Sequence, residues 1–252
     1  MSFFAVDNLG VRFGGVVAVD GVSFEVKEGD VYTIIGPNGA GKTTIFNLIG
    51  LIYQPTTGRI LFRERELRGA PHDVAQLGIA RTFQNIELFE QATVLQNLLI
   101  GRHRHRVTNL FDELLFRPSV RRAEIAQREA VERVIDLLDL AHYRDSRVAG
   151  LPYGIRKVVE LARALATEPQ LILLDEPSSG LNPEETDDMA FWIEDIRALG
   201  VTILMVEHDM NLVSRVSTRV LTLNEGRVIA EGTPAEVQSH PAVIEAYLGG
   251  GQ

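Results

Sequence analysis

The segment Gly36–Thr44 contains the residues whose types and spacing indicate the clearest chemistry in this sequence. Residues Gly36 to Thr43 match the pattern G-x-x-x-x-G-K-[ST] of a phosphate-binding loop. Glycines let the backbone curl so that successive N–H groups point at phosphate oxygens, and the helix that follows adds its positive end. The segment therefore predicts a site for the phosphates of a nucleotide.

Each position of this loop has an expected role. Lys42 supplies a mobile charge for the β- and γ-phosphates, and the hydroxyl of Thr43 can ligate Mg²⁺. The other residues of the loop that are expected to bind the nucleotide are Gly36, Asn38, Gly39, Ala40, Gly41 and Thr44. Taken alone, the loop indicates nucleotide binding and no particular reaction.

Two acids and a histidine follow two other apolar segments. Leu171–Asp175 is typical of a buried strand that ends in an acid, and Glu176 comes next. An aspartate there can hold Mg²⁺ through water, and Glu176 can orient or deprotonate an attacking water. His208 follows the apolar segment Thr202–Val206. Ligands of parallel α/β sheets lie at the carboxyl ends of strands, so these groups are expected to meet near the phosphate loop. An acidic helix cap and a satisfied polar histidine are the alternatives.

The elements that must position these groups follow from the apolar pattern. Val31–Ile35 is nearly all apolar or β-branched, as in a strand buried on both faces. A helix from about Lys42 to Leu48 is expected to stop at Gly50. The first thirty residues predict short strands joined by turns. Other expected elements are a strand at 58–62, a helix from Asn182 to Leu199 closed by Gly200, two strands within 219–230, and helix over most of 235–248.

The region from about 89 to 166 changes to a helical pattern. Apolar residues recur at helical spacing in two sets, and Pro169 is expected to end the second; the sets are Val131, Val134, Ile135 and Leu138, and Val158, Leu161, Ala162 and Leu165. The basic stretch 102–106 alternates arginine with histidine. It is interpreted as a solvated loop, because its arginines would repel a bound cation.

Length and composition exclude several classes. The 252 residues suit one large domain or a core with an insertion, and a formal charge of −9 argues against a nucleic-acid partner. The absence of cysteine excludes disulfides and cysteine-based zinc sites. There is no signal-peptide pattern and no run of 18 apolar residues, so the protein is expected to be cytoplasmic and to reach a membrane only through a partner.

These motifs resemble ABC-type ATPases, the nucleotide-binding subunits of ATP-driven transporters, over essentially the whole chain. The resemblance implies an α/β fold: a P-loop NTPase (RecA-like) core with an N-terminal antiparallel β subdomain and an inserted α-helical subdomain. Residues 1–252 would form a single ABC ATPase domain. About 1–84 and 167–252 would be the catalytic core with the β subdomain, and about 85–166 the helical subdomain.

The resemblance also implies roles for individual residues. Phe13 matches the aromatic residue that stacks on adenine, and Gln84 matches the Q-loop glutamine that touches Mg²⁺ and senses the transmembrane partner. Both residues belong to the implied ATP-binding set. Leu171–Glu176 matches the Walker B strand, with Glu176 catalytic, and 179–182 matches the D-loop. His208 matches the switch histidine. The implied catalytic set is Glu176, His208 and Lys42, the implied metal set is Thr43, Gln84 and Asp175, and the cofactors are ATP and Mg²⁺.

The family's signature motif is altered in this sequence. Residues 151–157 occupy its position, and Leu151, Tyr153 and Gly154 are expected to complete the ATP site of a partner subunit in trans. The usual form is Leu-Ser-Gly-Gly-Gln, whereas Pro152 and Ile155 here replace the serine and the glutamine. Because proline offers no hydroxyl, we expect weakened action in trans and an asymmetric pair of ATP sites in a heterodimer.

The resemblance is closer to ATP-binding subunits of branched-chain amino acid importers. It rests on residues 12–15 with 18–19, 81–84, the insert 111–122, 207–210 and the terminal 246–249. The implied partners are integral-membrane permease subunits, a second ATPase subunit in a heterodimer or homodimer, and, indirectly, a periplasmic or extracellular substrate-binding protein. The implied location is the inner face of the cell membrane, as a peripheral protein.

Several alternatives stay open from the sequence. Importers of urea or short amides and the lipopolysaccharide-export ATPase share much of this pattern. A soluble ABC ATPase that remodels DNA or ribosomes usually has two fused ATPase halves or a long coiled-coil insertion, and this sequence shows neither. A kinase or GTPase with the same phosphate loop would leave Gln84, the signature and His208 unexplained. A partner that binds ATP without hydrolysing it conflicts with an intact Glu176. The sequence does not identify the substrate or the direction of transport.

Overall fold

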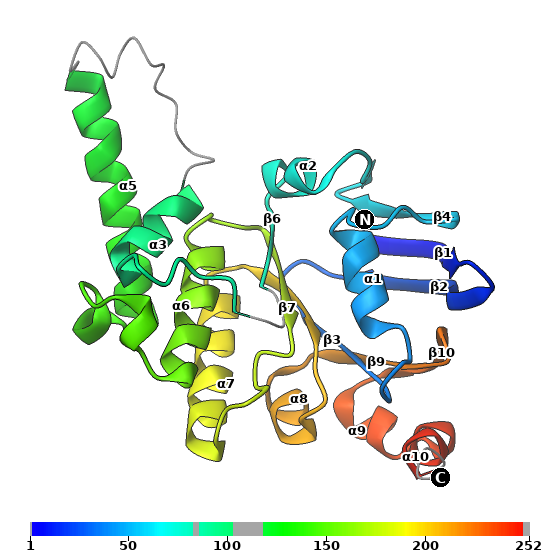
Figure 1. Cartoon of the computed structure of the whole chain (residues 1–252). Coiled ribbons are helices and arrows are strands. Elements are labelled where there is room, and N and C mark those ends of the chain that lie inside the picture. Colours follow the sequence, from blue (N-terminus) through cyan, green and yellow to red (C-terminus); the bar gives the residue numbers. More distant parts are fainter. Residues whose placement is uncertain (1, 83–85, 103–117, 249–252) are drawn as a thin grey trace. The chain divides into compact units, whose positions relative to one another are not determined.

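The computed structural model describes residues 2–82, 86–102 and 118–248, and the chain forms two compact units (Figure 1). The first unit is made of residues 1–84 and 170–252, and the second of residues 85–169. The first unit thus combines the two ends of the chain, and the second is inserted between them.

A mostly parallel sheet runs through the first unit (Figure 1). Its order is β10-β9-β3-β8-β7-β6, with β9 and β10 antiparallel and the other neighbours parallel. The predicted strands at 31–35, 171–175 and 202–206 are confirmed, each buried along its length. The strands are β3 (Val31–Ile35), β6 (Ile79–Arg81), β7 (Leu171–Asp175), β8 (Thr202–Val206), β9 (Arg219–Asn224) and β10 (Arg227–Gly232).

A second, antiparallel sheet in the same unit has the order β2-β1-β4-β5. Its strands are β1 (Phe4–Phe13), β2 (Val16–Val26), β4 (Thr57–Phe62) and β5 (Arg65–Glu66). The expectation of short strands near the N-terminus is wrong, because β1 and β2 have 10 and 11 residues. Their pairing contains register shifts, which interrupt the alternation that a sequence pattern relies on.

The sequence predicted helix starts in the first unit near residues 42, 182 and 235, but not the helices at 71–76 and 210–216. The side chain of Asn182 caps α7 by accepting from Glu185 N at 3.0 Å. Gly50 caps α1, but with a φ of −74°, and Leu51 takes the left-handed conformation at a φ of 54°. The helices are α1 (Lys42–Ile49), α2 (Pro71–Gln76), α7 (Pro183–Ala198), α8 (Met210–Val216), α9 (Pro234–Gln238) and α10 (Pro241–Leu248).

Alternation along β3 divides its side chains between two apolar clusters. Tyr32 and Ile34 belong to a large cluster that also includes side chains of α1, β1, β2 and β7. Ile35 belongs to a smaller cluster with side chains of α8, α9 and α10, namely Val213, Val237 and Val243. Both faces of the sheet are therefore covered, which explains why its central strands are buried at every position and mostly apolar.

The second unit is helical, with α3 (Val94–Gly101), α5 (Pro118–Leu137) and α6 (Tyr153–Leu165), and the short 3₁₀ turns η2 (Ala141–Tyr143) and η3 (Val148–Gly150). The predicted apolar face of α6 is buried, but the helix ends at Leu165 rather than at Pro169. Arg102 is also buried and donates to Ala166 O at 3.0 Å, so the solvated-loop interpretation is wrong there. Residues 103–106 lie outside the described residues. Among the helices described, none combines the length and apolar character needed to span a bilayer.

Candidate nucleotide site

Three loops meet at one edge of the parallel sheet. β8 lies between β3 and β7, and Val206 near its end is in register with Ile34 on one side and with Asp175 on the other. From these strands the chain enters the phosphate loop (36–41), the Glu176 loop (176–182) and the His208 loop (207–209). Since the carboxyl ends of parallel strands share an edge, residues far apart in the sequence become neighbours there.

The phosphate loop joins β3 to α1 through backbone conformations that favour glycine. Gly36, Gly39 and Gly41 have φ values of 148°, 82° and 102°. A Cβ atom would lie 2.2 Å from Leu223 O if added at Gly36, and 2.7 Å from Ala18 O if added at Gly41. Two of the three glycines are therefore required by close backbone approach as well as by φ. Of the predicted binding residues in this segment, Asn38, Gly39 and Thr43 are exposed, Gly41 and Thr44 are half-buried, and Gly36, Ala40 and Lys42 are buried.

Lys42 folds back onto the loop that precedes it. Its Nζ donates to Gly36 O at 2.6 Å and to Pro37 O at 3.0 Å. Burial lowers the pKa of Lys42, whereas the nearby carboxylates of Glu176 and Asp175 raise it. The ammonium group is thus held at the loop and beside the acids at the end of β7. An anion in the loop could replace the two carbonyl oxygens as its partner.

Asp175 ends β7 with only 2% of its surface exposed. Its Oδ2 accepts from an Arg81 guanidinium nitrogen at 3.0 Å. Its Oδ1 is buried and has no hydrogen-bond partner among the described residues. A buried oxygen without a partner is costly, and carboxylate oxygen is a preferred ligand of Mg²⁺. The donor set therefore fits the predicted metal position.

Glu176 and His208 approach each other across the edge of the sheet. Glu176 Oε2 lies 3.8 Å from His208 Nδ1, and the backbone N–H of Glu176 donates to Val206 O at 2.9 Å. Glu176 has a left-handed φ of 50°. Such strain in a non-glycine residue costs about 1–3 kcal/mol and is concentrated at functional sites. The structure brings together the acid and the histidine that were predicted to act on the nucleotide.

Three residues of this region were missed by the sequence analysis: Glu207, Arg81 and Tyr53. Glu207 is fully buried, and its carboxylate accepts hydrogen bonds from its own loop and from the Glu176 loop. One signal was available for Glu207, because it is an acid directly after a buried strand. Arg81 had no comparable signal, since the acceptors of its guanidinium come from positions 46, 47 and 175.

Tyr53 lies against Phe13, the residue predicted to stack on adenine. The two ring centroids are 5.0 Å apart and the ring planes are inclined by 69°, which is an edge-to-face contact. Phe13 ends β1 and Tyr53 follows α1, and both rings remain partly exposed. This pair offers the first unit an accessible aromatic surface of the kind on which a base can stack.

The residues predicted for the signature lie in the second unit. Leu151 is buried after η3, and Pro152 is the N-cap of α6 without a side-chain hydrogen bond to the helix. In the first turn of α6, Tyr153 is exposed and Gly154 is buried. Gln84, predicted to contact both ATP and Mg²⁺, lies outside the described residues.

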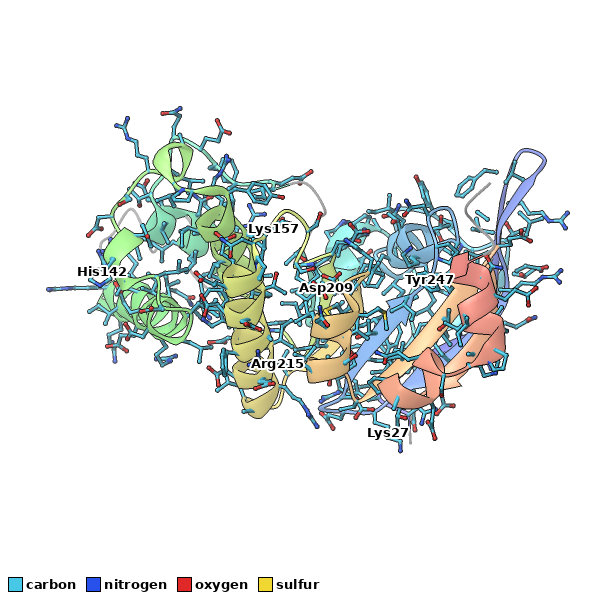
Figure 2. All side chains as sticks on the ribbon, turned by 90° about the horizontal axis from the view of Figure 1, so that it is seen from below. Lys27, His142, Lys157, Asp209, Arg215 and Tyr247 are labelled. Carbon is cyan, nitrogen blue, oxygen red and sulfur yellow. The ribbon has the colours of Figure 1, made fainter. Side chains whose placement is uncertain are left out.

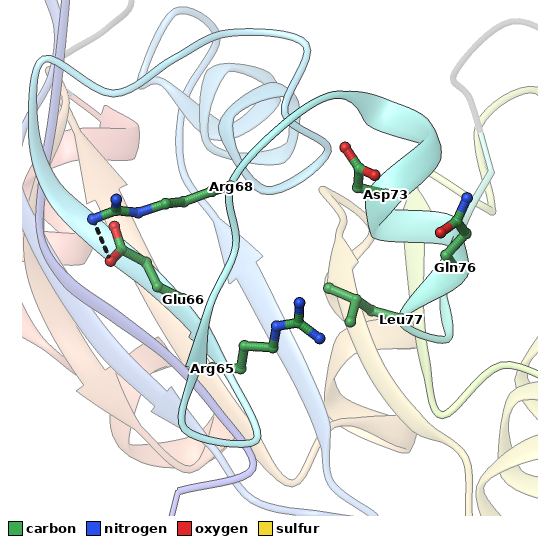
Figure 3. A pocket seen from close by; sticks show the side chains of 6 residues that line it. All are labelled: Arg65, Glu66, Arg68, Asp73, Gln76 and Leu77. Carbon is green, nitrogen blue, oxygen red and sulfur yellow. Dashed lines mark hydrogen bonds and ion pairs between the residues drawn. The ribbon is translucent and has the colours of Figure 1, made fainter.

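A separate pocket of about 570 Å³ lies in the region of β5 and α2 (Figure 3). Arg68 and Glu66 form an ion pair at 2.8 Å in its wall. The described residues that line it are Arg65, Glu66, Arg68, Asp73, Gln76 and Leu77. None of these six was predicted to bind a nucleotide, so we assign the pocket no part in the site.

Comparison with protein families gives two matches. The family described as "ABC transporter" matches residues 19–179, which is more than half of the chain and includes the phosphate loop, Asp175 and Glu176. The family described as "Branched-chain amino acid ATP-binding cassette transporter" matches residues 227–252. The two matches cover different parts of the chain, and both families are ATP-binding cassette transporters.

Individual proteins are similar over nearly their whole length. The high-affinity branched-chain amino acid transport ATP-binding protein LivG of Salmonella typhimurium is 44% identical over 250 residues, covering 97% of each chain. BraF of Pseudomonas aeruginosa, with the same description, is 43% identical over 246 residues, covering 97% of this chain and 96% of that protein. A crystal structure of the ADP conformation of an ABC transporter's ATP-binding cassette has a TM-score of 0.86 at 33% identity, covering 99% of both chains. The predicted fold class is thereby confirmed.

Proposed function

This chain belongs to the ABC transporter family, and on that premise we propose that it powers the import of branched-chain amino acids. It is the ATP-binding and ATP-hydrolysing subunit, and a separate membrane permease carries the substrate. The observation that supports the hydrolytic role most directly is the meeting of Lys42, Asp175, Glu176 and His208 at one edge of the sheet.

The phosphate loop and α1 form the proposed site for the nucleotide. Backbone N–H groups of residues 38–44 would donate to the phosphates, and the positive end of α1 adds to their attraction. Lys42 Nζ exchanges its carbonyl partners for β- and γ-phosphate oxygens. Phe13, supported at its edge by Tyr53, stacks on the adenine.

The proposed metal ligands are Thr43, Asp175 and Gln84. Asp175 Oδ1 suits this role because it is buried and lacks a hydrogen-bond partner among the described residues. Arg81 holds the other oxygen of Asp175 and so fixes the direction of Oδ1. When bound, Mg²⁺ neutralises the charge that develops on the phosphates during transfer.

In the proposed reaction, Glu176 orients a water for in-line attack on the γ-phosphate and accepts its proton. His208 and Lys42 stabilise the charge that develops on the transferred group. The signature residues Leu151, Tyr153 and Gly154 complete the ATP site of a second ATPase subunit that faces this one head to tail. ATP binding then closes the dimer, and release of the products reopens it.

We place this subunit at the inner face of the cell membrane, bound to a pair of permease subunits. The names of the relatives and the match at residues 227–252 support a branched-chain amino acid importer. A substrate-binding protein outside the membrane would deliver the amino acid to the permease. The Gln84 region and the helical unit after it would carry the motion between ATPase and permease.

Replacement of the proposed base tests the hydrolytic role. Glu176→Gln keeps the size of the side chain but cannot accept the proton, so hydrolysis should fall about 10²- to 10⁴-fold while ATP binding persists. The matched control is Asp188→Asn, which removes a carboxylate from an exposed position on α7. Phosphate release and nucleotide affinity are measured for both. Normal turnover by Glu176→Gln would refute the assignment of the base.

Purification of the chain from native membranes tests its proposed partners. A permease pair and a second ATPase should co-purify with it, and leucine, isoleucine or valine should stimulate ATP hydrolysis by the reconstituted complex with its binding protein. Stimulation by urea or a short amide alone would move the substrate to a related importer class. Recovery with ribosomes or DNA and no permease would contradict a transport role.

A further inference from the structure

Glu207 is a fully buried carboxylate to which the proposed reaction assigns no role. Burying a carboxylate is strongly unfavourable unless hydrogen bonds or a counter-charge compensate it. Here four donors surround it: Ser178 N at 2.9 Å, Ser178 Oγ at 2.6 Å, His208 N at 2.6 Å and Asp209 N at 3.0 Å. A protein that only needed to fill this space could have used an apolar residue.

The four hydrogen bonds divide evenly between the two carboxylate oxygens. Oε1 accepts both bonds from Ser178, in the Glu176 loop. Oε2 accepts both bonds from the His208 loop, through the N–H groups of His208 and Asp209. One carboxylate therefore joins two loops that are 29 residues apart in the sequence. The His208 loop continues directly into α8, whose N-cap is Asp209 (Figure 2).

We infer that Glu207 is a positioning residue that holds the Glu176 loop and the His208 loop together as one hydrogen-bonded unit. This inference rests on the proposed ATPase function and refines it. Glu207 does not touch the nucleotide in this reading. It acts through Ser178, two residues after the proposed base, and through His208, whose backbone N–H donates to Oε2 and whose imidazole Nδ1 lies 3.5 Å from the same oxygen. These contacts keep Glu176 and His208 at their 3.8 Å separation.

The side-chain chemistry of Glu207 suits this task better than that of its isostere. All four neighbours donate, so an acceptor-only group with two oxygens satisfies every one of them. Glutamine would keep one oxygen but turn an NH₂ group toward the other pair of donors. Hydrogen bonds to a charged acceptor are also about twice as strong as neutral ones. Glu207→Gln should therefore release one loop from the other while preserving the volume of the side chain.

The experiment compares Glu207→Gln with wild type in the full-length chain, together with the subunits that co-purify with it. We expect kcat for ATP hydrolysis to fall about 10- to 100-fold, because small displacements of positioned groups cost that much. The dissociation constant for ATP should stay within about threefold, because the phosphate loop is untouched. Amide hydrogen exchange at Ser178, His208 and Asp209 should accelerate. Glu236→Gln is the matched control: Glu236 also accepts from a backbone N–H and a hydroxyl, but is exposed on α9.

A second variant covers the case in which Glu207→Gln fails to fold. Ser178→Ala removes only the hydroxyl that donates to Oε1, so it should lower kcat by less while leaving ATP affinity unchanged. If Glu207→Gln folds, the double variant should be no slower than Glu207→Gln alone, since both changes weaken the same connection.

Three outcomes decide the matter. If Glu207→Gln folds and keeps the kcat of the wild type, the inference is wrong. If Glu207→Gln does not fold, a wild-type kcat in Ser178→Ala has the same meaning. Either result leaves the proposed ATPase function intact. A lower melting temperature with unchanged kcat and KM would show a purely structural role and overturn it as well. Absence of ATP hydrolysis in the wild-type complex would overturn both the inference and the proposed function.

Discussion

Asp175 and Asp7 each pair with an arginine at 3.0 Å, yet the two ion pairs differ in burial. The side chains of Arg81 and Asp175 are 11% and 2% exposed, whereas those of Arg59 and Asp7 are 56% and 52% exposed. Water screens the exposed pair, while the buried pair must satisfy its own charges. Although the contact distance is the same, loss of the Arg81–Asp175 pair should therefore lower the free energy of unfolding more than loss of the Arg59–Asp7 pair.

Arg81→Met tests this difference. It leaves Asp175 buried without its cation, so the free energy of unfolding should fall by about 3–5 kcal/mol. Arg59→Met, the matched control at the surface, should cost less than about 1 kcal/mol. Urea denaturation of the two variants measures both values. Equal losses for both variants would contradict the role given to burial.

Phe13 and Tyr53 make a second prediction at the scale of single residues. Phe13→Ala removes the surface proposed to stack on adenine, so the dissociation constant for ATP should rise by about 5- to 100-fold, which corresponds to about 1–3 kcal/mol. Phe13→Trp should retain affinity, and Tyr53→Leu should weaken it less than Phe13→Ala. Titration with ATP measures each value. Phe191→Ala, which removes an exposed phenyl ring from α7, is the control.

At the scale of elements, the phosphate loop is constrained by the strands around it. Both Gly36 and Gly39 have positive φ, but only Gly36 has backbone in the place of a Cβ, with Leu223 O at 2.2 Å. Gly39→Ala should cost about 1–2 kcal/mol from backbone strain alone. Gly36→Ala should lower the free energy of unfolding further and abolish ATP binding. Urea denaturation and ATP titration of the pair measure this, and similar losses of stability would show that β9 does not constrain the loop.

The C-terminal helix α10 packs against the end of the strand that leads into the same loop. Its Val243 packs in the cluster that contains Ile35, the last residue before the phosphate loop. Tyr247 also lies on α10 (Figure 2). Partial burial raises the pKa of Tyr247, and the polar backbone of Gly36 lowers it. The segment that matches the branched-chain family thus packs against the strand that leads into the proposed nucleotide site.

At the scale of the whole molecule, we expect the altered signature to weaken the action of this subunit on a second ATPase subunit. Pro152 has a φ of −54° and a ψ of 154° and makes no capping hydrogen bond, so serine fits the same backbone. Pro152→Ser should stabilise α6 by about 1 kcal/mol and add the missing hydroxyl. ATP-driven dimerisation and turnover in the assembled complex should both rise. Light scattering and phosphate release measure them.

Pro152→Ala separates the two effects of that substitution. It relieves the proline ring but supplies no hydroxyl, so dimerisation and turnover should stay at the level of the wild type. If Pro152→Ser also leaves both unchanged, the hypothesis of asymmetric ATP sites is wrong. A rise in both variants would assign the effect to the proline ring rather than to a missing hydrogen bond.

Local sequence patterns were enough to predict the phosphate loop, the buried strands at 31–35, 171–175 and 202–206, and the capped start of α7 at Asn182. These features depend on residues close together in the sequence: glycines that permit a turn, apolar runs that bury a strand, and a side chain that caps the next turn. Family resemblance added residues with no local signal, such as Phe13.

The contacts that surround the site came only from the tertiary structure. Strand order places β8 between β3 and β7, although β8 is the last of the three in the sequence. That order brings Glu207 to Ser178, and the packing of β6 brings Arg81 to Asp175. Hydrogen bonds between residues 29 and 94 positions apart leave no periodic trace, because each depends on the whole sheet being assembled first. The sequence by itself therefore predicted which groups should bind phosphate, and the tertiary structure decided which groups hold them in place.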